Sequence, residues 1–505
     1  MKTRLSILLV TVNLAGGCAL EPEAEGQAPA LPAPTETPTL ASTPPLLPPA
    51  TATVAPTFTA AATAAATAPA TATTMPPAAA DQSTGASNLP TISADGQVVA
   101  FTSSGWLAPD SQGANEAIYV RDRSNGTTTL VNRTLDGAAS EFPVYGLALS
   151  ANGQVVAYFS HDGRLVADDE LDCGIPEDPI SCEDLFIYQR ADGSTARLAL
   201  GRGQGLGKDY TVALSADGRL VAHGATVWEW ASGQAETAPT VDGQPPVGHT
   251  FAPQFGGEGR YLAFISAAAN LVPDDTNDAY DVFIWDRQAG TVERVSMASD
   301  GSQADDISGA LPFHEGVGHA LALAADGRFV AFTSLASNLS PEPLAQCDDP
   351  FTGAIRPCYP LYLHDRQTGE TRALTPQANG DSQSPTLSAA GRWLAFASLA
   401  TNLTDDSLPA CQFPAMINCA QIYLLDTAEN QLRLVSRASE GNGVTAGNGG
   451  SWQVDLSAEG DQAAFVSTAS NLVAGDTNDV ADIFLFEPAS GQVTRVSLKS
   501  QALLP

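Results

Sequence analysis

Residues 93–101 read Ser-Ala-Asp-Gly-Gln-Val-Val-Ala-Phe, a small polar turn followed by an apolar stretch. Seven copies of this pattern, some with substitutions, occur along the 505-residue chain, at spacings of about 57, 65, 41, 68, 64 and 69 residues. The turns begin at Ser93, Ser150, Ser215, Gly256, Ala324, Ser388 and Ser457. Self-similarity on this scale is typical of solenoids and propellers.

The fourth repeat shows what each copy contains. Residues 261–266, 282–285 and 292–296 are rich in aromatic and β-branched side chains, and Gly290 marks a hairpin turn between the last two. With the strand before the Asp-Gly turn, every repeat supplies four antiparallel strands. Four such strands repeated seven times predict an all-β fold, a seven-bladed β-propeller over residues 88–505.

The third repeat is the weakest one. It passes almost directly from Val221-Ala222-His223 to residues 227–230 and has no long loop between them. Six blades therefore stay open as the alternative. Since residues 493–497 supply the seventh repeat with a fourth strand of its own, we expect the first blade to pack on the seventh through side chains, without strand exchange.

Three features carry a resemblance to a known family. They are the Asp-Gly turns, the Val-Ala-Phe strands at residues 99–101 and 330–332, and the Asp-Arg pairs at 122–123, 286–287 and 365–366. In these features the chain resembles the TolB-type, WD-repeat-like β-propeller family over residues 89–498. The resemblance implies the architecture and no particular ligand, because such propellers serve many unrelated tasks.

The N-terminus has the features of an export signal. Lys2 and Arg4 precede an apolar run over residues 5–14, which is too short to span a bilayer. The following Leu-Ala-Gly-Gly-Cys, ending at Cys18, resembles a bacterial lipoprotein cleavage site. That resemblance implies a signal peptide over residues 1–17 and a lipid-anchored, extracytoplasmic chain that starts at Cys18. Ordinary secretion is the alternative.

Residues 18–87 form a segment of their own kind. They are almost wholly Ala, Pro, Thr and Glu and show no apolar periodicity. Such a composition offers nothing to bury and predicts a disordered linker between the anchor and the propeller.

The six other cysteines support export. They fall into three pairs separated by 8 to 11 residues. Six cysteines allow about 15 pairings, but the local grouping favours three nearest-neighbour disulfides. These are Cys173–Cys182, Cys347–Cys358 and Cys411–Cys419.

The charge balance limits the partners. The chain has 56 acidic and 23 basic residues, a net charge of −33. This charge repels nucleic acid and anionic membrane surfaces, so we expect no nucleic acid partner and membrane contact only through the lipid anchor. Protein or carbohydrate partners at the cell envelope are compatible with this charge.

One face of the propeller is expected to carry the contacts. The Asp-Gly turns and the Gly290-type turns lie at one end of the blades, and the loops between second and third strands lie at the other. All three cysteine pairs and acidic clusters such as 168–172 and 405–406 are in those loops. Long loops on a rigid scaffold are where binding usually occurs. Acidic loops that merely solvate the protein are the competing interpretation.

Two of these loops share an Asp-Thr-Asn pattern. Oxygen-bearing side chains at relative positions 1, 3 and 7 suit a hard cation such as Ca²⁺. The candidate ligands are Asp275, Asn277 and Asp281 in the fourth repeat and Asp476, Asn478 and Asp482 in the seventh. The alternative is that these side chains bond backbone amides and only shape the loops.

Enzymatic motifs are weak. His314 and His319 lack the i, i+4 spacing of a zinc helix, and no Gly-x-Ser-x-Gly nucleophile site occurs. We therefore predict a binding or scaffolding module without catalytic residues. A carbohydrate-active enzyme, a glycosidase or lyase using loop carboxylates in the funnel, is the alternative, and a spacer without a small ligand is a third possibility. We expect Trp285 and Trp393 to be core residues and Trp106 to be exposed on the loop face.

Overall fold

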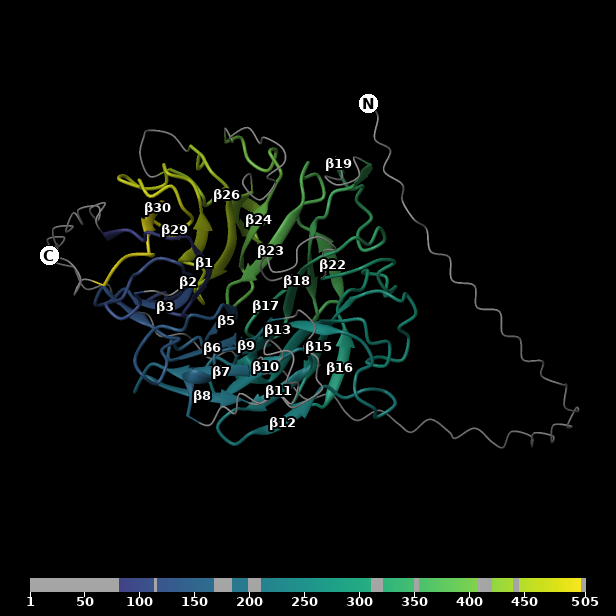
Figure 1. Cartoon of the computed structure of the whole chain (residues 1–505). Coiled ribbons are helices and arrows are strands. Elements are labelled where there is room, and N and C mark those ends of the chain that lie inside the picture. Colours follow the sequence, from purple (N-terminus) through teal and green to yellow (C-terminus); the bar gives the residue numbers. More distant parts are fainter. Residues whose placement is uncertain are drawn as a thin grey trace, which may run out of the picture. The chain divides into compact units, whose positions relative to one another are not determined.

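The computed structural model describes residues 81–112, 116–167, 184–198, 210–309, 321–348, 354–406, 408, 420–438 and 445–500. Their strands form seven four-stranded antiparallel sheets and one two-stranded hairpin. Figure 1 shows the seven sheets set around a common centre, with the first strand of each sheet innermost. The seven-bladed prediction is confirmed, and the six-bladed alternative is wrong because the third repeat forms a complete blade.

Each blade takes its strands from one repeat. Blades 1 to 3 contain β1 (Ser87–Ile92), β2 (Val98–Ser103), β3 (Ala117–Asp122) and β4 (Thr127–Leu130); β5 (Val144–Leu149), β6 (Val155–Ser160), β7 (Asp184–Gln189) and β8 (Ser194–Leu198); and β9 (Ala213–Leu214), β10 (Leu220–His223), β11 (Thr226–Glu229) and β12 (Gln234–Thr237). Blades 4 and 5 contain β13 (Thr250–Gly256), β14 (Tyr261–Ser266), β15 (Asp281–Asp286) and β16 (Thr291–Arg294); and β17 (Leu321–Leu323), β18 (Phe329–Thr333), β21 (Leu361–Asp365) and β22 (Glu370–Ala373).

Blades 6 and 7 complete the ring. They contain β23 (Ser382–Leu387), β24 (Trp393–Ser398), β25 (Gln421–Asp426) and β26 (Gln431–Leu434); and β27 (Ser451–Leu456), β28 (Ala463–Ser467), β29 (Asp482–Glu487) and β30 (Gln492–Arg495). The extra hairpin, β19 (Gln346–Asp348) and β20 (Ile355–Pro357), lies in the loop between β18 and β21.

The core between blades is built from the Val-Ala-Phe strands. In six blades an aromatic residue of the second strand lies opposite an aromatic residue of the third, and both are fully buried. Their ring centroids are 5.8 to 6.0 Å apart. In blade 3 this position holds His223, which faces Thr226 instead. Buried aromatic pairs contribute beyond their apolar area, so this motif explains why the repeat keeps a Phe or Tyr at that point.

The Asp-Gly turns lie at one end of the blades, which we call the turn face. In the first turn the Ser93 hydroxyl accepts a hydrogen bond from the Val98 amide at 3.0 Å. Gly96 follows with a φ of 69°, a conformation that favours glycine. The second residue of each turn is Ala or Gly, and six of the seven turns bond the backbone of the next one. These bonds run from the amides of Ala94, Asn152, Gly257, Ala325, Ala389 and Ala458 to the carbonyls of Ala151, Ala216, Ala325, Ala389, Ala458 and Ala94.

Arginines that directly follow the third strands join neighbouring blades on the turn face. Arg190 donates to the Gly153 carbonyl of its own turn at 2.7 Å and to Asp122 of the preceding blade at 3.1 Å. Arg287 and Arg366 make the same two kinds of contact. Arg123 does so across the junction of blades 1 and 7, where it pairs with Glu487 at 3.5 Å.

The ring closes without strand exchange, as expected: in the described residues β1 and β27 each pair only within their own sheets. The closing segment (residues 81–86) lies against the end of blade 7 instead. Gln82 forms a backbone bridge with Leu498, and the Lys499 amide donates to the Asp81 carbonyl at 2.9 Å. Gln82 and Ser83 are buried. The packed domain therefore begins before residue 87, where the sequence placed the end of the linker.

Candidate functional site

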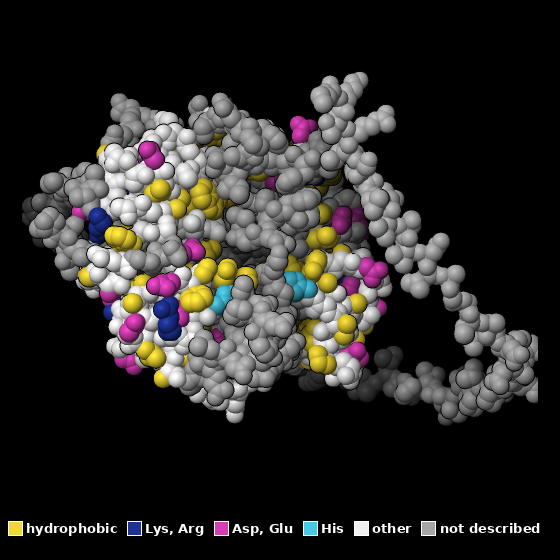
Figure 2. Space-filling model, viewed as in Figure 1, with side chains coloured by type: hydrophobic (Ala, Val, Ile, Leu, Met, Phe, Trp, Pro, Cys, Tyr) yellow, Lys and Arg dark blue, Asp and Glu magenta, His cyan; other side chains and the backbone are white. Residues whose placement is uncertain are grey.

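The opposite end of the blades, which we call the loop face, carries the loops between second and third strands and the connections between blades. Figure 2 shows this face, with a hollow at its centre that hydrophobic and histidine side chains border. One of the predicted disulfides, Cys347–Cys358, is present there and joins the two ends of the β19–β20 hairpin. Cys18, Cys173, Cys182, Cys411 and Cys419 lie outside the described residues.

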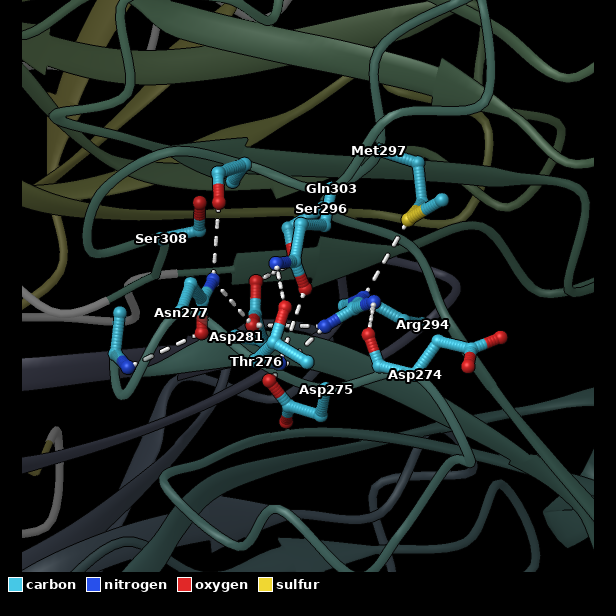
Figure 3. Close-up of polar contacts among 12 residues, drawn as sticks. Asp274, Asp275, Thr276, Asn277, Asp281, Arg294, Ser296, Met297, Gln303 and Ser308 are labelled. Carbon is cyan, nitrogen blue, oxygen red and sulfur yellow. Dashed lines mark hydrogen bonds and ion pairs between the residues drawn. The ribbon is translucent and has the colours of Figure 1, made fainter.

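The Asp-Thr-Asn loop of blade 4 brings its predicted ligands together around an arginine (Figure 3). Arg294 Nη1 lies 3.1 Å from Asp275 Oδ1 and 3.4 Å from Asp281 Oδ2. All three side chains are buried, with 6%, 4% and 0% exposed. The guanidinium thus occupies the place between the carboxylates that a cation would need.

Hydrogen bonds fix the same cluster. Asn277 Nδ2 donates to Asp281 Oδ2 at 2.9 Å and to the Ala304 carbonyl at 3.0 Å, and Asn277 Oδ1 accepts from the Ala279 amide. Burial raises the pKa of the Asp281 carboxyl, and the hydroxyl of Ser296, the Asn277 amide and the Arg294 charge oppose that rise. The side chains of this loop therefore bond backbone groups and one another, which was the alternative to metal binding.

Blade 7 repeats this arrangement. Arg495 lies 2.8 Å from Asp476 and 3.5 Å from Asp482. Asn478 Nδ2 donates to Asp482 at 2.8 Å and to the Ser83 carbonyl of the closing segment at 3.0 Å. Burial raises the pKa of Asp476 and of Asp482, against the effect of Arg495.

Calcium binding by these loops stays a prediction, and a cation would compete with four buried ion pairs, two in each loop. Within the described ranges, no group of three or more His, Cys, Asp or Glu side chains is placed to hold a metal ion.

Exposed apolar side chains gather on the loop face. The structure describes six large hydrophobic residues that are exposed, and each lies in a loop or connection at this end of the blades. They are Trp106, Leu135, Phe142, Val241, Val247 and Ile355, with exposures from 43% to 74%. The prediction that Trp106 is exposed there is confirmed. Trp285 is buried and Trp393 is half-buried.

The innermost strands carry a feature that the sequence analysis missed. In five blades the pairing of the first two strands shifts register through a bulge. One residue in each bulge has a positive φ: Leu89, Gly146, Ala252, Ser384 and Gln453. A left-handed conformation at four non-glycine positions is strained. Only Gly146 gives a sequence signal, because a Cβ there would lie 1.9 Å from the Tyr210 carbonyl oxygen.

A second missed feature is a set of asparagines that hold the connections. Asn338 Nδ2 donates to the Gln303 carbonyl at 2.8 Å, and its Oδ1 accepts from the Asp305 amide at 3.1 Å. The equivalent residues are Asn270, Asn402 and Asn471. All four precede a leucine, so a repeated Asn-Leu pair was the signal that could have found them.

The central channel contains a cavity of about 250 Å³ at its turn-face end, lined by first strands of all seven blades. Among the described residues that line it, the acidic ones are Glu258 and Asp455. The Asp455 carboxylate accepts hydrogen bonds from the Ile92 and Leu456 amides, both at 2.9 Å, and from the hydroxyls of Thr91 and Thr386. It holds blades 1, 6 and 7 together.

His364 is a buried histidine whose Nδ1 lies 2.8 Å from the Thr371 hydroxyl. Burial lowers the pKa of His364. His314 and His319 lie outside the described residues. In the part of the chain that the structure describes, no helix has the length and hydrophobicity to span a membrane.

Comparison with known proteins gives likeness in structure alone. No family model matches the chain, and no curated protein matches it in sequence. The β-propeller domain of the Trilobed protease from Pyrococcus furiosus is similar, with 10% identity and a TM-score of 0.44 over 82% of this chain and 95% of that one. TolB from Acinetobacter baumannii shows 11% identity and a TM-score of 0.36 over 83% and 64%. An oligogalacturonate lyase in complex with manganese shows 12% identity and a TM-score of 0.42 over 75% and 83%.

Proposed function

We propose that this protein is an extracytoplasmic binding module, tethered at the cell envelope, whose loop face is the contact surface. The observation that carries the proposal is the distribution of exposed apolar side chains, since all six that the structure describes lie on that face. Because the described exposed apolar side chains are confined to one face, that face is favoured over the other as the interaction surface.

The turn face differs from the loop face in a way that supports the loop face as the contact surface. Its turns bond one another through their backbones, and its arginines, such as Arg190 and Arg366, are paired with carboxylates and carbonyls. A surface whose polar groups are already paired within the protein offers little to a partner. The long loops between second and third strands lie at the other end.

The envelope tether rests on the sequence. Cys18 after an export signal and the linker that follows it would hold the propeller at a membrane through lipid, with ordinary secretion as the alternative. The described chain begins at Asp81, whose carbonyl accepts from the Lys499 amide. The linker would therefore join the propeller at the junction of blades 7 and 1.

A catalytic role has less support. A glycosidase commonly uses two carboxylates that face the substrate, and the Asp455 carboxylate in the channel already accepts four hydrogen bonds from the protein. This engagement favours binding over catalysis.

Site-directed photo-cross-linking in the producing cells tests the proposal. A photo-reactive residue replaces Leu135, Val247 or Ile355 on the loop face and, as matched controls, Asn125 or Ala289 on the turn face. We expect a cross-linked envelope component from the loop-face positions alone. Equal cross-linking from the turn face, or none from the loop face, would reject the loop face as the contact surface.

A further inference from the structure

Aromatic side chains cluster where three neighbouring blades reach the loop face. In the first group Tyr145 stacks on Tyr210 with ring centroids 4.3 Å apart, and His161 meets Tyr145 edge-on at 5.8 Å. Tyr145 lies in β5 of blade 2, and Tyr210 precedes β9 of blade 3. Both tyrosines are half-buried and pack against the edge of the core between blades 2 and 3.

The second group belongs to blade 4. His249 stacks on Phe251 with centroids 5.1 Å apart, and the ring of Tyr280 stands edge-on to Phe251 at 5.5 Å. His249 is exposed, and the other two are half-buried. Phe251 and Tyr145 both precede a bulge residue of an innermost strand, so the two groups occupy equivalent places around the central channel.

Thr211 connects the two groups. Its carbonyl lies 2.9 Å from His223 Nδ1, and its hydroxyl oxygen accepts a hydrogen bond from the Ala252 amide at 2.7 Å. Between them, β10 and β11 of blade 3 are joined by Gly224 and Ala225 alone. Blade 3 therefore has only a short turn between its second and third strands, where its neighbours have a long loop.

We infer that these two aromatic groups, Tyr145 with Tyr210 and His249 with Phe251 and Tyr280, form a binding site for a neutral glycan at the loop-face mouth of the channel. The inference rests on the proposed function, since it places the ligand on the same contact surface. Aromatic rings offer apolar faces to the C–H groups of a sugar, and tyrosine and histidine add polar edges that bond its hydroxyls.

The charge of the site selects the class of glycan. Neither group contains a Lys or Arg, and the chain as a whole carries a net charge of −33. An anionic sugar chain needs cationic partners for its carboxylates, so uronic acid polymers fit poorly. A neutral glycan is not repelled by the negative charge of the protein, and it makes the stacking contacts.

Isothermal titration calorimetry of the purified full chain tests the inference. The probes are the hexamer of N-acetylglucosamine and cellohexaose as neutral glycans and hexagalacturonate as the anionic one. We expect saturable binding of a neutral hexamer and weaker binding of hexagalacturonate. The Tyr145→Ala and Phe251→Ala variants each lose about twofold to tenfold in affinity, the range that one stacking contact contributes.

Two further variants separate binding from folding. Tyr145→Phe keeps the ring and is expected to retain affinity within about twofold. Trp230→Ala, which removes a half-buried aromatic side chain from the turn face, is expected to bind as the unchanged protein does. The inference fails if neither neutral hexamer binds, or if Trp230→Ala weakens binding as much as Tyr145→Ala. If it fails while Leu135 and Ile355 still give the loop-face cross-link, the contact surface stands and only the glycan site is wrong.

Discussion

Gln82 and Leu498 pair their backbones in an antiparallel bridge, so the first and last described parts of the propeller lie side by side. Gln303 and Met297 form the same bridge within the connection from blade 4 to blade 5. In the connection from blade 4 to blade 5, one continuous stretch of chain supplies both sides of this bridge. At the junction of blades 7 and 1, the closing segment supplies one side and the residues after β30 supply the other. Every blade is complete, and the break in the ring falls in a loop.

This relationship predicts that the closing segment stabilises the ring. A chain that begins at Ser87 loses the bonds of Asp81, Gln82 and Ser83 to blade 7. At about 1 kcal/mol for each hydrogen bond, we expect the free energy of unfolding to fall by about 2–4 kcal/mol. Calorimetry should show a lower unfolding midpoint than for a chain that begins at Asp81, and equal midpoints would contradict the prediction.

The sequence predicted the fold well because each blade repeats local signals. The Ser93 hydroxyl and the positive φ of Gly96 are needed for the turn itself, so their spacing is visible in the residue order. The closing segment was assigned to the linker because its contacts are to residues at the other end of the chain. Nothing local in Asp-Gln-Ser distinguishes a packed segment from a polar linker.

The site was predicted less well. The pattern correctly brought Asp275, Asn277 and Asp281 together, but their partner, Arg294, follows in a different strand. The bulge at Ala252 gave no signal, because a non-glycine residue does not reveal a positive φ in advance. Aromatic residues at the channel mouth, such as Tyr145, look like core residues until the topology shows which strand end they occupy.

Arg495 is predicted to be essential for stability. Arg495→Met keeps an apolar chain against the Phe484 ring but leaves Asp476 and Asp482 buried without a counter-charge. Removing one partner of a buried ion pair costs about 3–5 kcal/mol. Denaturant unfolding should show this loss, with a smaller one for Arg260→Met, because the Arg260 side chain is 45% exposed in its pair with Asp286. Equal losses would show that the buried cluster has no special role.

The same cluster predicts the response to metal. Because Arg294 and Arg495 already lie between the carboxylates, we expect the unfolding midpoint to be the same in EDTA and in millimolar Ca²⁺. A ligand that binds only the folded state would raise it. A calcium-dependent rise that disappears when Asp275 and Asp476 are both changed to Ala would contradict this expectation and assign the loops as metal sites.

Three ion pairs of the turn face, each with an exposed arginine and a largely buried aspartate, predict a dependence on pH. Hydrogen bonds from Arg260, Arg328 and Arg392 hold the pKa of Asp286, Asp365 and Asp426 below its usual range. A carboxyl whose pKa is lower in the folded state stabilises the fold above its unfolded pKa, about 3.8, and loses this contribution as the pH falls through the folded value.

Changing these three aspartates together to asparagine removes that contribution and keeps the turns. We expect the variant to unfold at a lower temperature than the unchanged protein at pH 7, and the difference to shrink as the pH falls below about 3.8. The buried Asp281 and Asp482, whose pKa is raised, have the opposite sign, but they are present in both proteins and cancel in the comparison. Thermal unfolding from pH 7 down to pH 2.5 provides the measurement. A difference in midpoint that stays constant over this range would mean that the arginine pairs contribute through packing and not through charge.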